Sequence, residues 1–533
     1  MQIGIWLRAV GSTSVERTWW RESVFYQIYP RSFQDSNGDG IGDLQGIIRR
    51  LDHLNDGTPA SLGIDAIWLS PFYRSPMADF GYDVSDYCDV DPVFGRLADF
   101  DLLLAEAHRR GIRIIVDLVP GHTSDQHPWF QEARASLGNP KRDWYVWAKP
   151  RPGGGPPNNW RSVFTRFGSA WTLDPETGEY YLHHFLPQQP DLNWWNDAVR
   201  DAIESVMRFW LDRGVDGFRI DVAHGLVRDQ QLRSNPRFLL GRPRRNWDLE
   251  EVHAIHRRWR KVLDGYSDRM AVGEVDAPSL ARLVRYYGND DELSFPFNFH
   301  FLGQPWRAER FRAVVGQWER LLPAHAWPDY TLSNHDRSRA ATRYGLARAR
   351  AAALLLLTLR GTPFIYYGEE IGMTDVPIPP DRVVDVHGRD PERTPMQWDG
   401  TQGAGFTAGA PWLPIAADAT RVNVAAQRDD PASLLSFYRR LIWMRRGSPA
   451  LRAGTYRTLP APRGVFAYLR EANDEHLAIA INFTDREARV RLGTGAAPIL
   501  LSTQHGRDGE LDLAAVALAP NEGIVARIGG QAG

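Results

Sequence analysis

Three acidic residues lie at or near the ends of strand-like segments, and their types and spacing could support cleavage of a bond between two sugars. Hydrolysis of a glycosidic bond requires one carboxylate that is held ionised and one carboxylic acid that is held protonated. Carboxyl groups that end separate parallel strands can meet at one edge of a barrel, so these residues are candidate catalytic groups. They are Asp221 in Gly217–Val222, Glu274 in Met270–Val275 and Asp336 at the end of Tyr330–Asp336.

Arg219 lies two residues before Asp221, which on a β-strand directs both side chains to the same face. A guanidinium beside a carboxylate favours the ionised, nucleophilic form of the acid. Taken alone, the pair is more readily explained as a structural ion pair, because buried ion pairs are common and mostly structural. The rest of the sequence therefore has to decide whether the pair is structural or catalytic.

Glu274 and Asp336 differ in their surroundings. Glu274 follows Gly273 in an apolar run, and apolar surroundings favour the protonated form that a general acid needs. Asp336 adds a third negative charge, and the adjacent His335 could donate hydrogen bonds to sugar hydroxyls. Each acid alone could cap a helix or fix a loop. Three acids at the ends of three separate strand-like segments favour a catalytic site instead.

Eight strand-like segments alternate mostly with helix-like segments, which predicts parallel strands that close into a (β/α)₈ TIM barrel of the α/β class. The helix-like segments include Asn246–Leu263, Ala347–Leu359 and Leu434–Arg446. The predicted strands are Val24–Pro30, Ile64–Pro71, Ile112–Val119, Gly217–Val222, Met270–Val275, Ser294–Phe299, Tyr330–Asp336 and Pro363–Glu369.

Two regions depart from this alternation. A stretch rich in Pro, Gly, Asn and Trp follows strand three and predicts an inserted, loop-rich subdomain. Near the end of the chain the hydrophobic period changes to two, which predicts a C-terminal all-β sandwich domain. The predicted division is 20–122 for the first part of the barrel, 123–190 for the insert, 191–454 for the second part with an extended segment at about 372–412, and 455–533 for the β-domain.

An acidic loop follows strand one and could hold a hard cation. Its oxygen-bearing side chains recur at every second residue, with glycines between them, and Ca²⁺ or Mg²⁺ prefers several oxygens that converge from one tight loop. The alternative is a solvated turn stabilised by its own Asp and Asn side chains. The candidate ligands are Asp35, Asn37, Asp39, the backbone carbonyl of Ile41, and Asp43.

Composition limits the classes of partner and the cellular compartment that we expect. The 533 residues are 43% hydrophobic with a formal net charge of −2, so bulk charge does not favour nucleic acid or membranes as partners. A single cysteine, Cys88, excludes an internal disulfide and fits a reducing compartment. Met1–Trp20 has no long apolar core, which predicts no signal peptide, and Ala351–Leu359 is too short to span a bilayer. We therefore expect a cytoplasmic protein.

Taken together, the motifs resemble the α-amylase family of glycoside hydrolases, on its α-glucosidase and oligo-1,6-glucosidase branch. The resemblance extends from about Trp20 to the end of the chain. The motifs that carry it are Asp117–His122, Gly217–Val222, Val272–Val275, Ser333–Asp336, Gln189–Trp194 and Arg393–Asp399.

The resemblance implies a retaining double displacement and no organic cofactor. Asp221 would be the nucleophile, Glu274 the general acid and base, and Asp336 a stabiliser of the transition state. The acidic loop would bind a structural Ca²⁺ or Mg²⁺ ion. The terminal glucose would be held by Asp79, Tyr82, His122, Phe164, Phe185, Arg219, His335 and Arg393.

Two positions depart from the family pattern. Gly121 stands where family members usually carry an Asn that holds calcium in many α-amylases, which disfavours that particular calcium site. Val222 follows the nucleophile, where valine often accompanies α-1,6 preference on this branch. The continuation Ala223–Gly225 differs from the usual 1,6-type sequence, so Val222 is only a weak indication of linkage.

We expect an exo-acting α-glucosidase that releases glucose from short oligosaccharides, with maltose-type α-1,4 linkages favoured. An oligo-1,6-glucosidase, or a transglucosylase or sugar isomerase that uses the same covalent intermediate, is the alternative. A catalytically inactive transport-partner relative is disfavoured, because such proteins lack the catalytic acids that this chain has. We expect a small oligosaccharide as the partner, and a monomer or homodimer.

Overall fold

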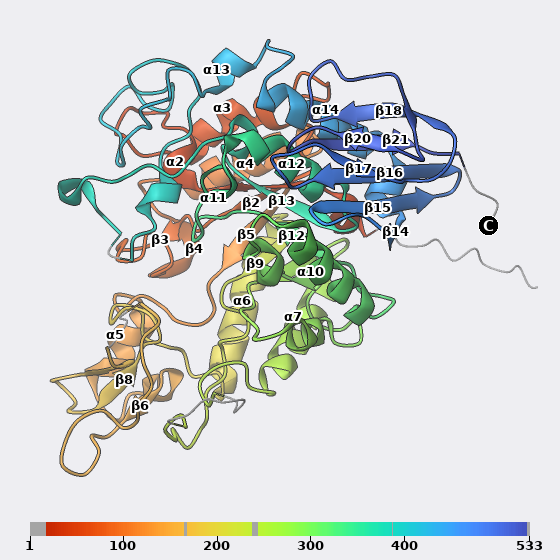
Figure 1. Ribbon diagram of the computed structural model, residues 1–533. Helices are drawn as coiled ribbons and strands as arrows, with labels where there is room; N and C mark the ends of the chain where they lie inside the picture. Colours follow the sequence, from red (N-terminus) through yellow and green to blue (C-terminus); the bar gives the residue numbers. More distant parts are fainter. Residues whose placement is uncertain (1–17, 165–167, 237–243, 386, 530–533) are drawn as a thin grey trace, which may run out of the picture.

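Eight parallel strands form the centre of the computed structural model, which describes residues 18–164, 168–236, 244–385 and 387–529. The prediction of no signal peptide falls mostly on residues 1–17, outside the described ones. Figure 1 shows the strands surrounded by helices. Along the sheet the strands are β11 (Phe295–Pro296), β10 (Met270–Gly273), β9 (Gly217–Ile220), β5 (Arg113–Leu118), β2 (Ala66–Leu69), β1 (Phe25–Ile28), β13 (Thr362–Tyr366) and β12 (Asp329–Thr331).

The predicted (β/α)₈ barrel is confirmed by this order and by the parallel register of neighbouring strands. Phe25 of β1 pairs with Phe364 on one side and with Ala66 on the other. The two terminal strands of the ladder, β11 and β12, meet through a side chain: the N–H of Asn298 donates to the Asp329 carboxyl at 3.4 Å. All eight strands are almost wholly buried, as expected for parallel strands covered on both faces.

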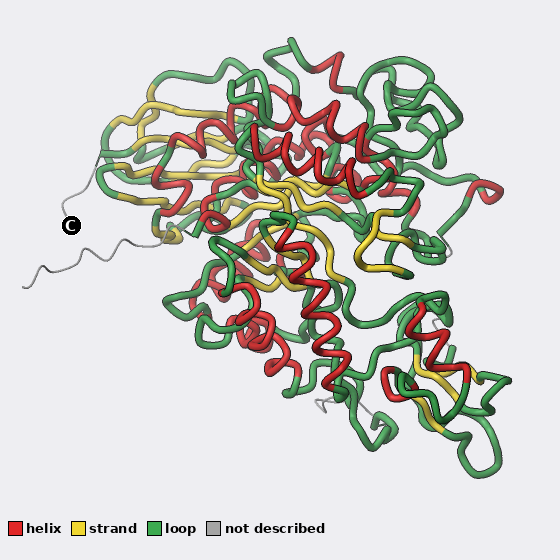
Figure 2. Tube along the Cα trace, turned by 180° about the vertical axis from the view of Figure 1, so that it is seen from behind, coloured by secondary structure: helices red, strands yellow, loops and turns green. Residues whose placement is uncertain are grey.

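Amphipathic helices cover the barrel (Figure 2). Each presents its apolar face to the strands, as α6 does with Val199, Ile203 and Trp210. The longer helices are α3 (Leu44–Leu54), α4 (Leu97–Arg109), α6 (Asp197–Asp212), α7 (Val252–Asp264), α10 (Ala308–Leu321), α12 (Ala349–Thr358) and α14 (Leu434–Gly447). Shorter ones are α1 (Trp19–Glu22), α2 (Pro30–Phe33), α8 (Leu280–Leu283), α9 (Phe299–Leu302), α11 (Ala340–Tyr344), α13 (Val424–Gln427) and α15 (Pro449–Ala453).

Several sequence predictions were wrong in their boundaries, and two of these differences shape the site described below. The predicted helix Asn246–Leu263 begins only at Val252, because residues 246–251 form an irregular wall of the cavity described below. The predicted strand Tyr330–Asp336 ends at Thr331, so Asp336 lies in the loop after β12. An isolated bridge between Asn334 and Arg337 shapes that loop.

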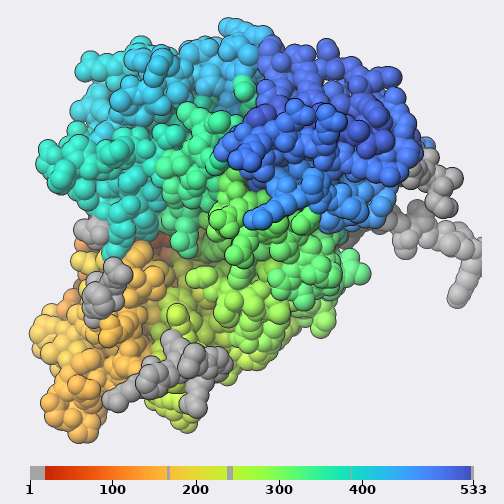
Figure 3. Space-filling view, viewed as in Figure 1, coloured from red at the N-terminus to blue at the C-terminus, as the bar shows by residue number. Residues whose placement is uncertain are grey.

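Two smaller parts flank the barrel on opposite sides of the molecule (Figure 3). Between β5 and α6 the chain forms α5 (Pro128–Ala135) and a three-stranded antiparallel sheet of β6 (Trp147–Ala148), β8 (Tyr180–Leu182) and β7 (Trp171–Leu173). After α15 come antiparallel strands β14 (Thr455–Thr458), β15 (Val465–Ala472), β16 (Glu475–Asn482), β17 (Ala488–Val490), β18 (Ala496–Ser502), β19 (Glu510–Asp512), β20 (Val516–Leu518) and β21 (Gly523–Arg527).

The C-terminal sheet is joined to the barrel through a buried arginine. Arg470 of β15 donates to the carbonyl of Thr358, at the end of α12, at 2.7 Å. The hydroxyls of Tyr468 and Thr358 also hydrogen-bond at 2.6 Å. None of the helices in the described ranges is long and apolar enough to cross a membrane.

Candidate active site

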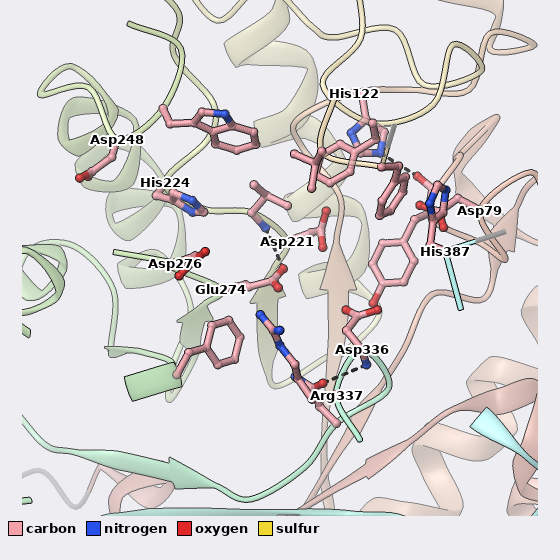
Figure 4. Close-up of a pocket in the computed structure, with 18 of the residues that line it drawn as sticks. Asp79, His122, Asp221, His224, Asp248, Glu274, Asp276, Asp336, Arg337 and His387 are labelled. Atoms are coloured by element: carbon pink, nitrogen blue, oxygen red, sulfur yellow. Dashed lines mark hydrogen bonds between the residues drawn. The ribbon is translucent and has the colours of Figure 1, made fainter. Parts of the chain in front are cut away.

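A cavity of about 1220 Å³ lies at the carboxyl ends of the barrel strands, between the barrel and the inserted segment. Figure 4 shows the acidic residues from separate strands pointing into one space. The predicted residues that line it are Asp79, Tyr82, His122, Phe164, Phe185, Asp221, Glu274 and Asp336. The other three predicted residues, Arg219, His335 and Arg393, are buried behind this wall and contact its members.

Arg219 forms ion pairs with three carboxyl groups at the ends of neighbouring strands. Its Nη1 lies 2.6 Å from Asp117 and 2.8 Å from Asp221, and its Nη2 lies 2.6 Å from Glu274. The strand register explains this, because β9 lies between β5 and β10 and so brings Arg219 beside both neighbours. The predicted pairing of Arg219 with Asp221 is present, and the same guanidinium also holds Glu274.

Arg219 was expected to keep Asp221 ionised, and in the structure two opposing influences act on this carboxyl. Burial raises the pKa of Asp221 well above its usual value, and the neighbouring carboxyls of Glu274 and Asp117 raise it further against the pull of Arg219. Burial also raises the pKa of Asp117 to about 6. One guanidinium thus faces three carboxyls, and the protonated form of Asp221 is favoured more than its pairing with Arg219 alone would suggest.

Val222 adopts an unusual backbone conformation directly after Asp221. Its φ is +43°, a left-handed conformation that is uncommon for a β-branched residue and strained. In this conformation its N–H donates to Oε2 of Glu274 at 3.2 Å. The turn after β9 therefore positions Glu274 through the backbone while the Val222 side chain lines the cavity.

Asp336 lies in the loop after β12 among positive groups. Arg393 Nη2 approaches its Oδ1 to 2.7 Å, and Arg389 Nη1 approaches the same oxygen to 3.2 Å. Burial would raise the pKa of Asp336, but the His335 ring nitrogen 3.2 Å away and the guanidiniums of Arg393 and Arg389 together hold it far below its usual range. Asp336 is thus a permanently ionised carboxylate that faces the cavity.

Arg389 is a site residue that the sequence analysis missed. It lines the cavity, and its Nη2 lies 2.5 Å from Asp79 Oδ1, while Asp385 binds the guanidinium from the other side at 2.9 Å. Arg393, which was predicted to bind sugar, donates to Asp336 and to the carbonyl of His335 from behind the cavity wall, and its contact with sugar stays a prediction. Arg389 precedes the Arg393–Asp399 motif by four residues in an irregular segment, and that proximity was the only sequence signal for it.

Tyr82 and His335 form a stacked pair on the cavity floor. Their rings are parallel within 5° with centroids 5.4 Å apart, and the Tyr82 hydroxyl lies 2.6 Å from His335 Nε2. Burial lowers the pKa of His335 well below its ordinary value, so the imidazole is neutral. Gln27 Nε2 lies 2.8 Å from Nδ1, which assigns the ring proton to Nε2, on the cavity side.

Aromatic rings from two segments close one end of the cavity. Phe164 and Phe185 from the insert lie 5.1 Å apart in an edge-to-face arrangement, and Phe164 stacks on His387 at 3.8 Å. His122 is held by Gln189, whose amide lies 3.1 Å from its Nε2 and donates to Asp79 at 2.9 Å. This end therefore combines apolar faces with hydrogen-bonding groups, as a sugar ring requires.

The opposite wall is built by the irregular segment before α7. The rings of Trp247 and His224 stack at 5.3 Å, and Trp247 lies so close to Gly225 that a Cβ there would come within 2.2 Å of the indole. Gly225 is therefore required for this contact. Both rings line the cavity, and Figure 4 shows His224 on the side where Glu274 lies, away from Asp79.

The acidic loop after β1 lies outside the cavity. Asp35 accepts hydrogen bonds from the N–H groups of Gly38 and Gly40, and Asp43 caps α3 by accepting from Gly46 N. Within the described ranges no three acidic, histidine or cysteine side chains group closely enough to hold a metal ion. The five predicted donors are nevertheless all oxygens, the type that hard cations prefer, so their chemistry fits Ca²⁺ or Mg²⁺. Metal binding stays a prediction.

The sequence and the fold match known proteins over most of the chain. The model of the alpha amylase catalytic domain matches residues 27–454. A probable alpha-glucosidase of Rhizobium meliloti (strain 1021) is 44% identical over 90% of this chain and 91% of its own length. An oligo-1,6-glucosidase of Parageobacillus thermoglucosidasius is 40% identical over 90% and 92%.

Solved structures agree with these relatives. The structure of XgtA, an alpha-glucosyl transfer enzyme, superposes with a TM-score of 0.89 at 40% identity and covers 96% of this chain and 99% of its own. The trehalulose synthase MutB of Pseudomonas mesoacidophila superposes with a TM-score of 0.88 at 35% identity, covering 96% of this chain and 99% of its own.

Proposed function

The chain belongs to the α-amylase family and is a glycoside hydrolase, and from this premise we propose that it is a retaining, exo-acting α-glucosidase. It removes terminal, non-reducing glucose from short oligosaccharides, with maltose-type α-1,4 linkages favoured. The observation that carries the proposal is the shared guanidinium: Arg219 holds Asp221 and Glu274 on its two terminal nitrogens at 2.8 and 2.6 Å. Closely spaced carboxyls are typical of retaining enzymes.

The reaction proceeds in two displacements. Asp221 attacks the anomeric carbon while the glycosidic oxygen takes a proton from Glu274 and departs with its sugar. Glu274, now ionised, then removes a proton from water, whose oxygen displaces Asp221 and releases glucose. Asp221 must be ionised for the first step, and the Arg219 guanidinium at 2.8 Å favours that form.

Exo action is supported by the closed end of the cavity. The Arg389–Asp79 ion pair at 2.5 Å and the stack of Phe164 on His387 lie beyond the catalytic carboxyls. A terminal glucose fits against these groups, whereas the middle of a long glucan needs an open path there. The ionised Asp336 binds the hydroxyls of the glucose and stabilises the positive charge that develops at the anomeric carbon.

Glucosyl transfer, the alternative function, is supported by the opposite wall. Trp247 and Phe299 line the cavity on the leaving-group side and offer flat apolar faces to a second sugar. A sugar bound there would compete with water for the covalent intermediate. XgtA, by its name an alpha-glucosyl transfer enzyme, shows that relatives of this fold carry out transfer.

The test is glucose release measured side by side from maltose, isomaltose, sucrose, trehalose and maltotriose. We expect release from maltose and maltotriose to be fastest, and Asp221→Asn to abolish release from every substrate while the protein stays folded. New di- or trisaccharides formed from concentrated maltose would favour the transfer alternative. No glucose from any substrate, or an active Asp221→Asn variant, would refute the proposal.

We also propose that the loop of Asp35, Asn37, Asp39, Ile41 and Asp43 binds a structural Ca²⁺ or Mg²⁺ ion. Its support is the run of oxygen donors in one tight turn. The metal would contribute stability and no step of the reaction, because the loop carries no group that lines the catalytic cavity.

We further propose a reducing compartment such as the cytoplasm. The single cysteine, Cys88, supports this proposal.

A further inference from the structure

A second cavity of about 500 Å³ adjoins the catalytic one. It lies between the loop after β10, helix α9 and the residues that follow Asp336. The two cavities have four wall residues in common, which are Asp276, Phe299, Asp336 and Arg337. The second cavity therefore adjoins the catalytic one along this shared wall.

Arg337 is the distinctive group on this shared wall. Its side chain is exposed and makes no ion pair or hydrogen bond with any part of the chain that the structure describes, whereas the nearby Arg343 is bound to the carbonyls of Leu302 and Leu332. Figure 4 shows Arg337 reaching from the Asp336 loop toward Glu274, with Asp276 on the far side of Glu274. Asp276 is likewise exposed and forms no ion pair within the described ranges.

We propose that the second cavity is a subsite for one further sugar unit of the leaving group, and that Arg337 is its main polar contact. The inference rests on the proposed α-glucosidase function and adds to it the length of the preferred substrate. With glucose at Asp221 and the next unit beside Glu274, the third unit of a trisaccharide enters the second cavity. Its hydroxyls bind the guanidinium of Arg337 and the carboxylate of Asp276, and its apolar face lies on Phe299.

The charges on this wall favour a neutral sugar over an anionic group. A phosphate or carboxylate would bind Arg337, but Asp276 and the ionised Asp336 would repel it. The second arginine of this cavity, Arg343, is already bound to two backbone carbonyls. Vicinal hydroxyls can instead donate to the carboxylate and accept from the guanidinium at the same time. Phe299, half-buried and stacked on Phe297 at 6.0 Å, gives a rigid apolar platform.

The experiment compares kcat/KM of the wild type and Arg337→Ala on three donors of increasing length. These are α-glucosyl fluoride, which has a one-atom leaving group, then maltose, then maltotriose. We expect the wild type to prefer maltotriose over maltose and Arg337→Ala to lose about tenfold on maltotriose, which removes that preference. The loss should be smaller on maltose and smallest on the fluoride. Arg337→Lys, which keeps a donor and the charge, should retain part of the preference.

Arg244→Ala is the matched control, because Arg244 is also an exposed arginine of the catalytic cavity but does not line the second one. It should leave the ratio of maltotriose to maltose unchanged. An equal loss on all three donors in Arg337→Ala, or an unchanged ratio, would overturn the subsite. Failure of the α-glucosidase proposal looks different, since the wild type would then cleave none of the three.

Discussion

Arg219 Nη2 lies 2.6 Å from Oε2 of Glu274, although Arg219 is the same residue that binds the nucleophile. The Glu274 carboxyl therefore lies close enough to act on Asp221. Burial raises the pKa of Asp221, and the nearby Glu274 carboxyl raises it further. A change at Glu274 should therefore alter the pKa of Asp221, the proposed nucleophile.

The first prediction follows from this coupling. Replacing Glu274 with Gln removes a negative charge beside Asp221, so the pKa of Asp221 should fall. The acidic limb of the kcat/KM profile should then move to lower pH by about one unit or more. The profile is measured on α-glucosyl fluoride, whose leaving group needs no protonation, so that Glu274→Gln remains measurable. An acidic limb at the wild-type pH would show that Glu274 does not control the ionisation of Asp221.

The second prediction separates the two arginines beside Asp336. Arg389 lies on the cavity surface against Asp79, so Arg389→Ala should lower kcat/KM on an aryl α-glucoside by about 10²-fold with a small change in melting temperature. Arg393 is buried, and its loss would remove hydrogen bonds that Asp336 and the carbonyl of His335 accept from it. Arg393→Ala should therefore destabilise the fold by about 3 kcal/mol.

Kinetics and thermal melting of both variants provide the check. Arg389→Lys should recover part of the activity, because it keeps a cation near Asp79 but loses the two-sided geometry. If Arg389→Ala were fully active and Arg393→Ala were inactive with an unchanged melting temperature, Arg393 would be the sugar-binding arginine, as the sequence analysis predicted.

The third prediction concerns Asp83, which anchors the loop that carries Asp79. Its carboxyl is buried and accepts hydrogen bonds from Ser75 Oγ, Ala78 N and Asp79 N at 2.8 to 2.9 Å. Burial, only partly opposed by these hydrogen bonds, raises the pKa of Asp83 to about 6. The folded state therefore binds this proton more tightly than the unfolded chain does.

The resulting stability is fully present below the unfolded pKa, near 4, and is lost as the pH rises through about 6. Relative to Asp83→Asn, which does not titrate, the free energy of unfolding of the wild type should fall by about 2 kcal/mol between about pH 4 and pH 7. Denaturant unfolding of both proteins across this range measures the difference. A difference that is constant with pH would mean that Asp83 keeps an ordinary pKa in the fold.

The sequence was sufficient for the barrel and for bringing the candidate acids to one cavity, because both leave local signals. The run Gly217–Ile220 is buried on both faces, and parallel register then places Asp221 and Glu274 at the same edge. Their contact with one guanidinium follows from the alternation of side chains on β9. The ionisation of Asp221 could not be predicted in the same way, since it depends on how many carboxyls surround Arg219 and how deeply all of them are buried.

Residues on irregular segments escaped the sequence analysis for a physical reason. Arg389 lies in a long loop without hydrophobic periodicity, and only tertiary contacts with Asp79 and Asp385 give it a position. Residues 246–251 have a helix-compatible composition, but Trp247 packs on His224 and takes this stretch out of the helix. Tertiary packing overrides local propensity at both places, and both line the cavity.

The last prediction concerns the proposed cation at the acidic loop. A bound ion stabilises the fold by mass action, about 3 kcal/mol when the ion is present at a hundred times its Kd. EDTA should therefore lower the melting temperature, and added Ca²⁺ or Mg²⁺ should restore it. The kcat on an aryl α-glucoside, measured well below the melting temperature, should change little. Asp39→Ala removes an exposed carboxylate of the loop and should abolish the response to EDTA. Elemental analysis that finds no metal in the purified protein, together with melting that EDTA does not alter, would instead identify the loop as a turn stabilised by its own hydrogen bonds, such as those that Asp35 accepts from Gly38 and Gly40.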